Sequence, residues 1–366
     1  MLAASRAGEA QRIADTLSNQ RIVGVLGEAD VGKTQTIRQA LSMLDGGART
    51  VYLDLDGAAG DGHVGFLLAK QVARALLGGV DLSLLNAGVL VPARVERRRL
   101  ALVETLGIEG MEESLREWPS GNYGSASALR GVEALAERAD LVLWVDHVEA
   151  PRLTPRHPVK ADRLLWGIRE LSQRHDHVRV VVSAREGAAD QITGPRAAFH
   201  QQGRWMSLDV PTASMWRDVA DRLGVSTRTA QELTALTDGH PQTMLLALVT
   251  MKLADGGWPS RAEDVLGELA AHDDGLAARA VQHARSLHRL GGQILIQVAC
   301  VQRPYAAAQR GSATSQEISK VLARLRLAGL LRRTDRWSVV NPLVAIRARG
   351  TVTEPPSTED WEDIDW

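Results

Sequence analysis

An eight-residue stretch near the start of the chain has the residue types and spacing of a phosphate-binding loop. It runs Gly27-Glu28-Ala29-Asp30-Val31-Gly32-Lys33-Thr34 and fits the pattern G-x-x-x-x-G-K-[ST] at every position. Glycines let such a backbone wrap tightly, so that successive N–H groups face phosphate oxygens. The lysine reaches the β and γ phosphates, and the threonine hydroxyl takes one position on Mg²⁺. Together with Gln35, these residues predict a site for a nucleoside triphosphate, most simply ATP, with Mg²⁺.

The segments on either side of this loop favour the same interpretation. Residues 21–26 indicate a short buried strand, and residues 36–44 a helix whose positive N-terminus faces the phosphates. Glu28 and Asp30 are unusual so close to a polyanion, and Asp30 stands where many such loops carry glycine. Because Asp tolerates unusual backbone angles better than most residues, we expect the loop to form and nucleotide affinity to be moderate.

A second candidate for the magnesium site ends an apolar run. Residues 141–146, Leu-Val-Leu-Trp-Val-Asp, are typical of a strand covered on both faces. Asp146 then lies at the carboxyl end of a parallel strand, where doubly wound sheets keep their ligands. This is the Walker B pattern, and with the loop upstream it predicts that Thr34 and Asp146 share the metal.

Further strands are expected at 50–55, 178–183 and 205–210, with helices at 3–17, 64–77 and 161–175. The order of these elements predicts an α/β fold with a parallel P-loop NTPase sheet, in which the fourth strand is inserted centrally. The spatial order of strands would be 5-1-4-3-2. Ser183, at the end of the fourth strand, would then lie beside the γ-phosphate, between the loop and Asp146.

From residue 212 onward the apolar spacing is helical, with helices expected at 212–223, 226–238, 241–253 and, as two short ones, 262–285. A helix at 286–300 follows, then a capping box at 314–317 that opens a helix to 327, and then a hairpin. Helices followed by a small hairpin predict a winged helix-turn-helix. The expected domains are an NTPase domain at 1–210, a helical lid at 211–280, the winged helix at 281–350 and an acidic tail at 351–366.

Charge is unevenly distributed, although the net charge is only −1. Residues 281–350 hold twelve Arg or Lys against two acids, a net charge of +10. This surplus predicts binding of duplex DNA, or alternatively docking on a protein. The expected DNA contacts lie on the second helix and the wing: Lys320, Arg324, Arg326, Arg332, Arg333 and Arg336.

The last thirteen residues, from Glu354, carry six acids and no base, with Trp361, Ile364 and Trp366 among them. We expect a mobile tail that either lies across the basic module and competes with DNA or docks a partner protein.

Other function classes are disfavoured by what the sequence lacks. No run of about eighteen apolar residues or signal peptide is present, so a cytoplasmic protein is expected. The single cysteine, Cys300, excludes an internal disulfide and a Cys-based zinc cluster. His157, His175 and His177 lack metal-ligand spacing, which argues against a metalloenzyme or nuclease. Arg97–Arg99 are interpreted as a solvated helix face rather than a nucleic-acid contact.

The order of these motifs resembles that of STAND and archaeal-type ATPases, relatives of the AAA+ and origin-recognition ATPases. The resemblance is carried by the loop, by the strands ending at Asp146 and Arg185, by Gly-His-Pro at 239–241, and by a winged helix ending at Asn341-Pro342-Leu343. It implies that Arg185 senses the γ-phosphate and that Pro241 lines the adenine pocket. It also implies that ATP switches the protein on through self-assembly, with slow hydrolysis.

One position departs from that family. Many members follow the Walker B aspartate with an acid that activates water, and here His147 stands there, with Glu149 two residues further on. Either side chain can act as a base, and we expect weak hydrolysis. Such proteins also need an arginine from a neighbouring subunit, for which Arg163, Arg169 and Arg174 are candidates.

Two functions therefore stay open. The first is an ATP-dependent switch ATPase that binds DNA or a partner through its winged helix. The second is a nucleotide-bound signalling scaffold whose winged helix docks protein. A small-molecule kinase is disfavoured, because kinases lack the sensor motif, the lid and the basic module. The regulated process, whether replication, transposition, transcription or phage defence, stays open, as does the oligomer size.

Overall fold

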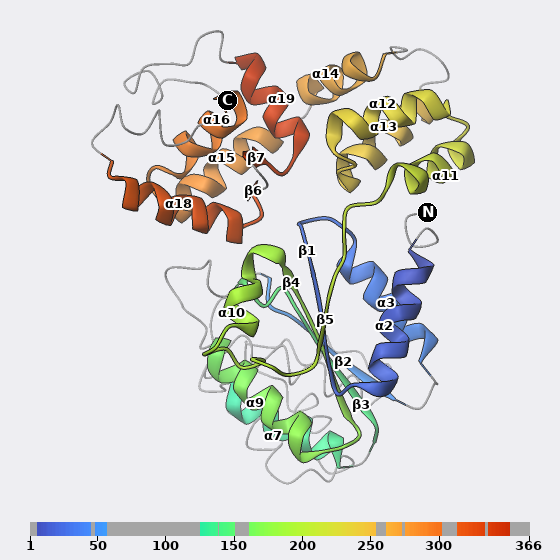
Figure 1. The fold of residues 1–366 in the computed structure, drawn as a ribbon, viewed down its shortest axis with the longest axis vertical. Helices are drawn as coiled ribbons and strands as arrows, with labels where there is room; N and C mark the ends of the chain where they lie inside the picture. The colour runs from blue at the N-terminus through green and yellow to red at the C-terminus, as the bar shows by residue number, and fades with distance from the viewer. Residues whose placement is uncertain are drawn as a thin grey trace, which may run out of the picture.

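The structure is a computed structural model that describes residues 6–44, 48–56, 125–137, 139–150, 161–253, 261–272, 275–301, 313–333 and 336–351. The helix expected at 64–77, the segment with Arg97–Arg99, His157 and residues 352–366 lie outside these ranges. An α/β part lies at one end of the long axis and the helical parts at the other (Figure 1). None of the helices in the described ranges is both long and apolar enough to cross a membrane.

The α/β part is built on one five-stranded parallel sheet. Its strands are β1 (Ile22–Gly27), β2 (Arg49–Asp54), β3 (Leu141–Asp146), β4 (Val178–Arg185) and β5 (Arg204–Ser207). They lie in the order β2-β3-β4-β1-β5, which is the predicted order read from the other edge. The predicted fold class is therefore confirmed for the sheet.

Both faces of the sheet are covered by helices (Figure 1). On one face lie α2 (Ala7–Asn19) and α3 (Lys33–Met43); on the other lie α7 (Ser125–Ala136), α9 (Ala161–Arg174) and α10 (Ala189–Thr193). Successive residues of β3 pack into different cores, Leu143 with the α9 side and Trp144 with the α2 side. Side chains of a strand alternate between faces, so a strand that is covered on both faces must be apolar throughout.

Four helices follow β5 in the region where the sequence predicts a lid, and we call them the lid. They are α11 (Ala213–Leu223), α12 (Thr227–Thr237), α13 (Pro241–Leu253) and α14 (Ala262–His272). Trp216 is fully buried at their centre, and its Nε1 donates to the Gly239 carbonyl at 3.1 Å. Asp238 and Gly239 both adopt left-handed backbone angles, which end α12 at Thr237, and these two residues separate it from His240-Pro241.

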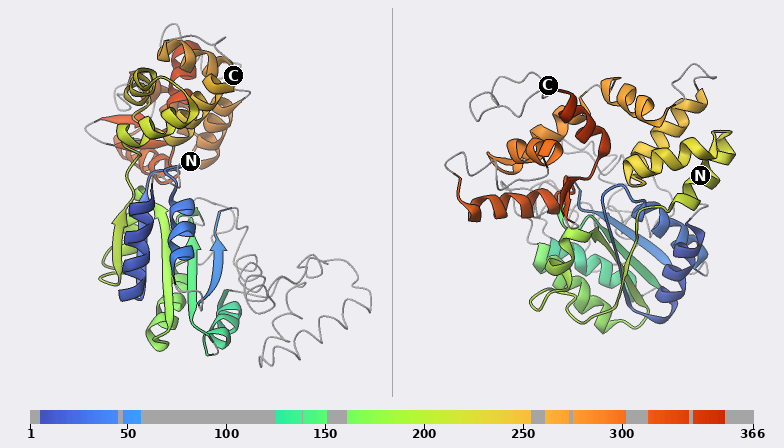
Figure 2. Two further views of the ribbon diagram at one scale, coloured as in Figure 1. Left: turned by 90° about the vertical axis from the view of Figure 1, so that its right-hand side faces the viewer. Right: turned by 45° about the horizontal axis from the view of Figure 1, so that its top comes forward.

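The remaining elements pack around a separate core, and we call them the C-terminal module. They are α15 (Leu276–Leu287), α16 (Gly291–Val301), α18 (Ser315–Leu327), the antiparallel strands β6 (Leu331–Arg333) and β7 (Trp337–Val339), and α19 (Pro342–Thr351). Thr314 caps α18 as predicted, because its hydroxyl accepts from the Glu317 amide at 3.2 Å, whereas the Glu317 side chain pairs with Arg289 at 2.9 Å. Both views in Figure 2 place this module and the lid above the same end of the sheet.

Two expectations for this region were wrong. The helix expected from 286 begins only at Gly291, because α15 continues to Leu287 and the chain turns at His288, whose backbone is extended. The helix α19 was not expected, although Pro342 stands at its first position, where proline is favoured. The expected domain boundary after 280 falls inside α15, and the division into domains stays a prediction.

We expect Leu143→Ala to lower the free energy of unfolding by about 2–5 kcal/mol, because it leaves a cavity beneath the sheet. Leu143 is fully buried, whereas Leu253 is 76% exposed at the end of α13. The control Leu253→Ala should change stability by less than about 0.5 kcal/mol. Urea unfolding of both variants tests this, and equal effects would contradict the core described here.

Candidate nucleotide site

The phosphate-binding loop connects β1 to α3 as predicted. Asp30 has a φ of 59° and Gly32 a φ of 93°, so both adopt the left-handed conformation. This confirms that the loop forms around Asp30 at a position that often carries glycine. Lys33 and Thr34 are the first residues of α3, three positions earlier than the sequence pattern indicated. The N-terminus of that helix therefore faces the loop.

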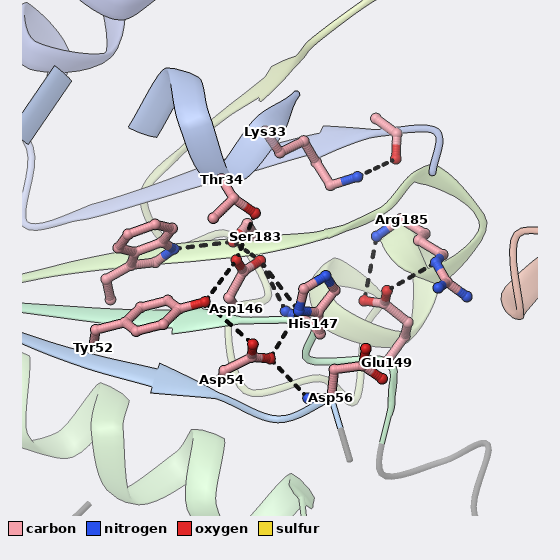
Figure 3. A network of polar contacts seen from close by, with 12 residues as sticks. Lys33, Thr34, Tyr52, Asp54, Asp56, Asp146, His147, Glu149, Ser183 and Arg185 are labelled. Carbon is pink, nitrogen blue, oxygen red and sulfur yellow. Dashed lines mark hydrogen bonds and ion pairs between the residues drawn. The ribbon is translucent and has the colours of Figure 1, made fainter. Parts of the chain in front are cut away.

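Lys33 is held inside the loop (Figure 3). Its side chain is buried, and Nζ donates to the carbonyls of Gly27 at 3.1 Å and Glu28 at 2.7 Å. Burial lowers the pKa of Lys33, while Glu149 and Asp146 oppose the shift. An ammonium whose partners are two neutral carbonyls is available to anionic oxygens, which make stronger charge-assisted bonds.

Asp146 lies at the centre of the site and is fully buried. One of its oxygens accepts from the Thr34 hydroxyl at 2.8 Å, and the other accepts from Ser183 Oγ at 2.5 Å (Figure 3). Trp144 Nε1 in turn donates to Ser183 Oγ at 3.1 Å. The structure thus brings together the predicted loop threonine, Walker B aspartate and sensor serine, because β4 pairs with both β1 and β3.

The oxygen atoms of Thr34 and Asp146 fit the preferences of Mg²⁺. This ion is usually held by one or two carboxylates, with substrate phosphates and waters completing its octahedron. In the described ranges no three His, Cys, Asp or Glu side chains gather as a cage that could hold an ion alone. A magnesium ion held by Thr34 and Asp146 would neutralise charge between the β and γ phosphates of a bound nucleotide.

His147 pairs with an acid that the sequence analysis did not single out. Its Nδ1 lies 2.8 Å from Asp54 Oδ1 at the end of β2 (Figure 3). The hydrogen bond to Asp54 raises the pKa of His147, with burial opposing. Burial likewise opposes ionisation of Asp54, yet its hydrogen bonds to His147 and to the Asp56 amide lower its pKa. This pairing favours a charged imidazole, which cannot accept a proton and is a poor general base.

The second candidate base, Glu149, is also engaged. It is 2% exposed, and Arg185 contacts it twice, through Nε at 3.4 Å and through the backbone amide at 3.3 Å. Arg185 Nη1 also donates to the carbonyl of Leu327, at the end of α18, at 3.3 Å. The predicted γ-phosphate sensor therefore lies in the site and touches the C-terminal module at the same time.

A cavity of about 310 Å³ adjoins the loop, between it, the lid and the C-terminal module. Ala29 and Asp30 line it from the loop, and His240 and Gln242 line it from the start of α13. Pro241, predicted to line an adenine pocket, stands between those two residues in the sequence; it is buried and is not among the described residues that line this cavity. Gln35 is exposed on α3.

Five of the six predicted DNA contacts are exposed on α18 or the hairpin: Lys320, Arg324, Arg326, Arg333 and Arg336. Arg332 differs from the expectation. Its guanidinium is 20% exposed and pairs with Glu28 of the loop at 3.6 Å and with Asp238 of the lid. In this arrangement the Arg332 guanidinium faces two acids of its own chain and does not face solvent, where DNA phosphates would lie.

The predicted arginine candidates on α9 do not behave alike. Arg169 Nη1 donates to the Ala198 carbonyl at 2.9 Å, and Arg174 pairs with Glu133. Arg163 is exposed. Because Arg169 already contacts a carbonyl of its own chain, it is poorly placed to reach the nucleotide of a second copy.

Arg6, which the sequence analysis did not select, is buried beside the loop. It is 3% exposed, its Nη2 donates to the Asp209 carbonyl at 2.7 Å, and Nε lies near Gly32. An arginine in an amphipathic helix gives no sequence signal for such burial.

Comparison with known proteins supports the fold. No protein-family model and no curated protein match the chain. Among solved structures, a Walker-type ATPase of Pyrococcus abyssi matches with a TM-score of 0.66 and 14% identity, covering 94% of this chain and 95% of that one. The ORC2 protein of Aeropyrum pernix, in ADPNP–ADP complexes, matches with a TM-score of 0.54 and 14% identity, covering 94% and 92%. The chain has the fold of these proteins.

The pair of His147 and Asp54 predicts a pH dependence of stability. A histidine with a pKa raised above its ordinary value of about 6.5 stabilises the fold below that value, and this contribution is lost as pH rises through the folded-state pKa. We therefore expect Asp54→Asn to destabilise the protein more at pH 6 than at pH 9. The difference should not exceed about 1 kcal/mol, because solvent screens the pair.

Urea unfolding at the two pH values measures this effect, with His272→Gln as a control on an exposed histidine of α14. A cost of Asp54→Asn that is the same at both pH values would show that the pair is not charged.

Proposed function

We propose that this protein is an ATP-binding switch with slow hydrolysis, which couples nucleotide state to self-assembly and to binding of DNA or a partner. We interpret the C-terminal module as a winged helix that carries this binding. The observation that carries the proposal is direct contact between the phosphate-binding loop and that module.

The nucleotide half of the proposal depends on the loop and on Asp146. Lys33 is buried and its partners are neutral carbonyls, and the Thr34 hydroxyl donates to Asp146. With the N-terminus of α3, these groups suit a magnesium-bound triphosphate. The ORC2 protein of Aeropyrum pernix, whose fold this chain shares, forms ADPNP–ADP complexes, which supports adenine nucleotides as the ligand class.

The coupling half depends on how closely the module approaches the loop. Leu327, the last residue of α18, is buried in the core of the α/β part. Gly329 follows with a φ of +70°, and a Cβ there would lie 3.1 Å from the Arg185 side chain and 3.2 Å from Ala29. Because the two are in such close contact, a movement of the loop would also displace the module.

An ion-pair network joins the same parts. Arg332 of β6 pairs with Glu28 of the loop and Asp238 of the lid. Burial raises the pKa of Glu28, and the charge of Arg332 opposes that shift. The acid that is unusual in a phosphate-binding loop thus has a partner on the module. Phosphates entering the loop would add negative charge beside this pair and change its energy.

Slow hydrolysis follows from the state of the two candidate bases. His147 is paired with Asp54, and Glu149 is held by Arg185. Neither is poised to take a proton from water in this arrangement. An arginine from a second copy would stabilise transition-state charge, and Arg163 is the exposed candidate on α9.

A signalling scaffold whose module docks protein is the second candidate function. It is favoured by Arg332, which faces acids of its own chain instead of solvent. Regulation by nucleotide would be the same in both cases. The two differ only in what the module binds.

We expect Lys33→Ala to lower affinity for a non-hydrolysable ATP analogue with Mg²⁺ at least about tenfold, because hydrogen bonds to charged groups contribute about 1.5–3 kcal/mol. Lys252→Ala, which removes an exposed lysine of α13, is the matched control. Isothermal titration calorimetry measures both. Wild-type affinity in the Lys33→Ala variant would rule out the nucleotide site.

For DNA binding, Glu28→Gln should raise the affinity of the nucleotide-free protein, because it removes one of the two acids that compete for Arg332 and leaves only Asp238. Arg332→Ala should lower affinity and reduce the slope of log affinity against log salt by about 1. Fluorescence anisotropy with a labelled duplex measures both, and Arg228→Ala, at an 88% exposed arginine of the lid, is the control. Unchanged DNA affinity in both variants would favour the protein-docking scaffold.

A further inference from the structure

His240 is a buried histidine with one ring nitrogen unsatisfied. It lies between α12 and α13 and is 4% exposed. Its Nδ1 accepts from the Thr243 amide at 3.4 Å and lies 3.0 Å from the Thr243 hydroxyl. Its Nε2 is buried and has no hydrogen-bond partner in the part of the chain that the structure describes. A buried polar atom without a partner costs about 1–3 kcal/mol, so such an atom calls for an explanation.

The surroundings determine which ring nitrogen carries the proton. Because Nδ1 accepts from a backbone amide, the proton of the neutral ring is on Nε2. Burial lowers the pKa of His240 to about 4; Asp30 opposes this shift and Arg332 adds to it. At neutral pH the side chain is therefore an uncharged imidazole whose single N–H donor, at Nε2, has no acceptor among the described residues.

His240 lines the cavity of about 310 Å³ beside the phosphate-binding loop. Ala29 and Asp30 of the loop form one wall, and the lining also includes Arg279 and Arg185, whose guanidinium contacts Glu149 as well. The volume exceeds that of a phosphate group with several waters, each of which occupies about 30 Å³ in the liquid. Two arginines in the lining, the Nε2 donor of His240 and the adjoining loop together suit an anionic oxygen.

We propose that Nε2–H of His240 donates a hydrogen bond to an oxygen of the terminal phosphate of a nucleoside triphosphate bound at the loop. The inference rests on the proposed nucleotide site and deepens it, because it assigns a residue that distinguishes triphosphate from diphosphate. The bond also explains why a polar side chain is kept in so buried a place.

The same contact places the terminal phosphate against the C-terminal module. Arg279 and His283 of α15 and Asn341 before α19 line the same cavity. A ligand that fills it touches the loop, the lid and the module together. A triphosphate therefore holds these three parts in one arrangement, and a diphosphate leaves the cavity without its anion.

The direct test is NMR of the full chain with ¹⁵N-labelled histidine, of which there are ten. His240→Gln assigns the signal, because it removes one histidine and keeps an N–H donor at similar reach. We expect the Nε2–H resonance of His240 to shift on addition of a non-hydrolysable ATP analogue with Mg²⁺, and to shift much less with ADP. A signal that does not move with the analogue, or that moves as far with adenosine alone, would overturn the assignment.

Affinities provide the second readout. His240→Leu should weaken binding of the ATP analogue about tenfold and of ADP much less, and His240→Gln should recover most of the difference. His272→Leu, at an exposed histidine of α14, is the matched control. Equal losses for both nucleotides, or no loss for either, would contradict the inference.

Failure of the inference is distinguishable from failure of the nucleotide site. If the wild-type protein binds no nucleotide, the proposed function itself falls. If it binds nucleotide, and Lys33→Ala loses that binding while the His240 signal and the His240→Leu affinities stay unchanged, only the role of His240 is wrong. Should His240→Leu fail to fold, the NMR result on the wild-type chain decides alone.

Discussion

The guanidinium of Arg185 connects the α/β part of the molecule with the C-terminal module. It neutralises Glu149, a carboxylate that is 2% exposed, and it donates to the carbonyl that ends α18. A buried carboxylate without a partner is strongly destabilising, so Arg185 cannot leave Glu149 without a substitute. The end of β4 and the C-terminal module are therefore fixed relative to each other by an interaction that lies inside the nucleotide site.

Under the proposed function, this contact would couple nucleotide binding to the position of the module. A phosphate near Arg185 offers the guanidinium an alternative anion, and phosphates in the loop add charge beside Glu28 and its partner Arg332. A ligand shifts an equilibrium between two arrangements only by its differential affinity for them. Coupling of this kind amounts typically to about 1–3 kcal/mol, enough for a switch that changes partner affinity five-fold or more.

Much of the fold and part of the site could be predicted from the sequence, because local patterns encode them. The phosphate-binding loop and the apolar strand ending at Asp146 follow from spacing within single elements. The central place of the strand ending at Ser183 and Arg185 follows from the order of elements along the chain. The pairs Glu28–Arg332 and His147–Asp54 join residues far apart in the chain, so no periodicity or motif indicates them. The start of α16 was misplaced for a related reason, since an apolar pattern that runs on past a turn does not show where the turn lies.

Hydrogen exchange of the whole chain with and without nucleotide tests most directly whether the loop and the C-terminal module act as one unit. The relevant amides are those of the hairpin, β6 (Leu331–Arg333) and β7 (Trp337–Val339), and of the last turn of α18. A non-hydrolysable ATP analogue with Mg²⁺ should change their protection in the wild-type protein and leave it unchanged in Lys33→Ala. If the analogue protects the loop and α3 but exchange in the hairpin and α18 stays the same, the nucleotide site and the module are independent and the account is wrong.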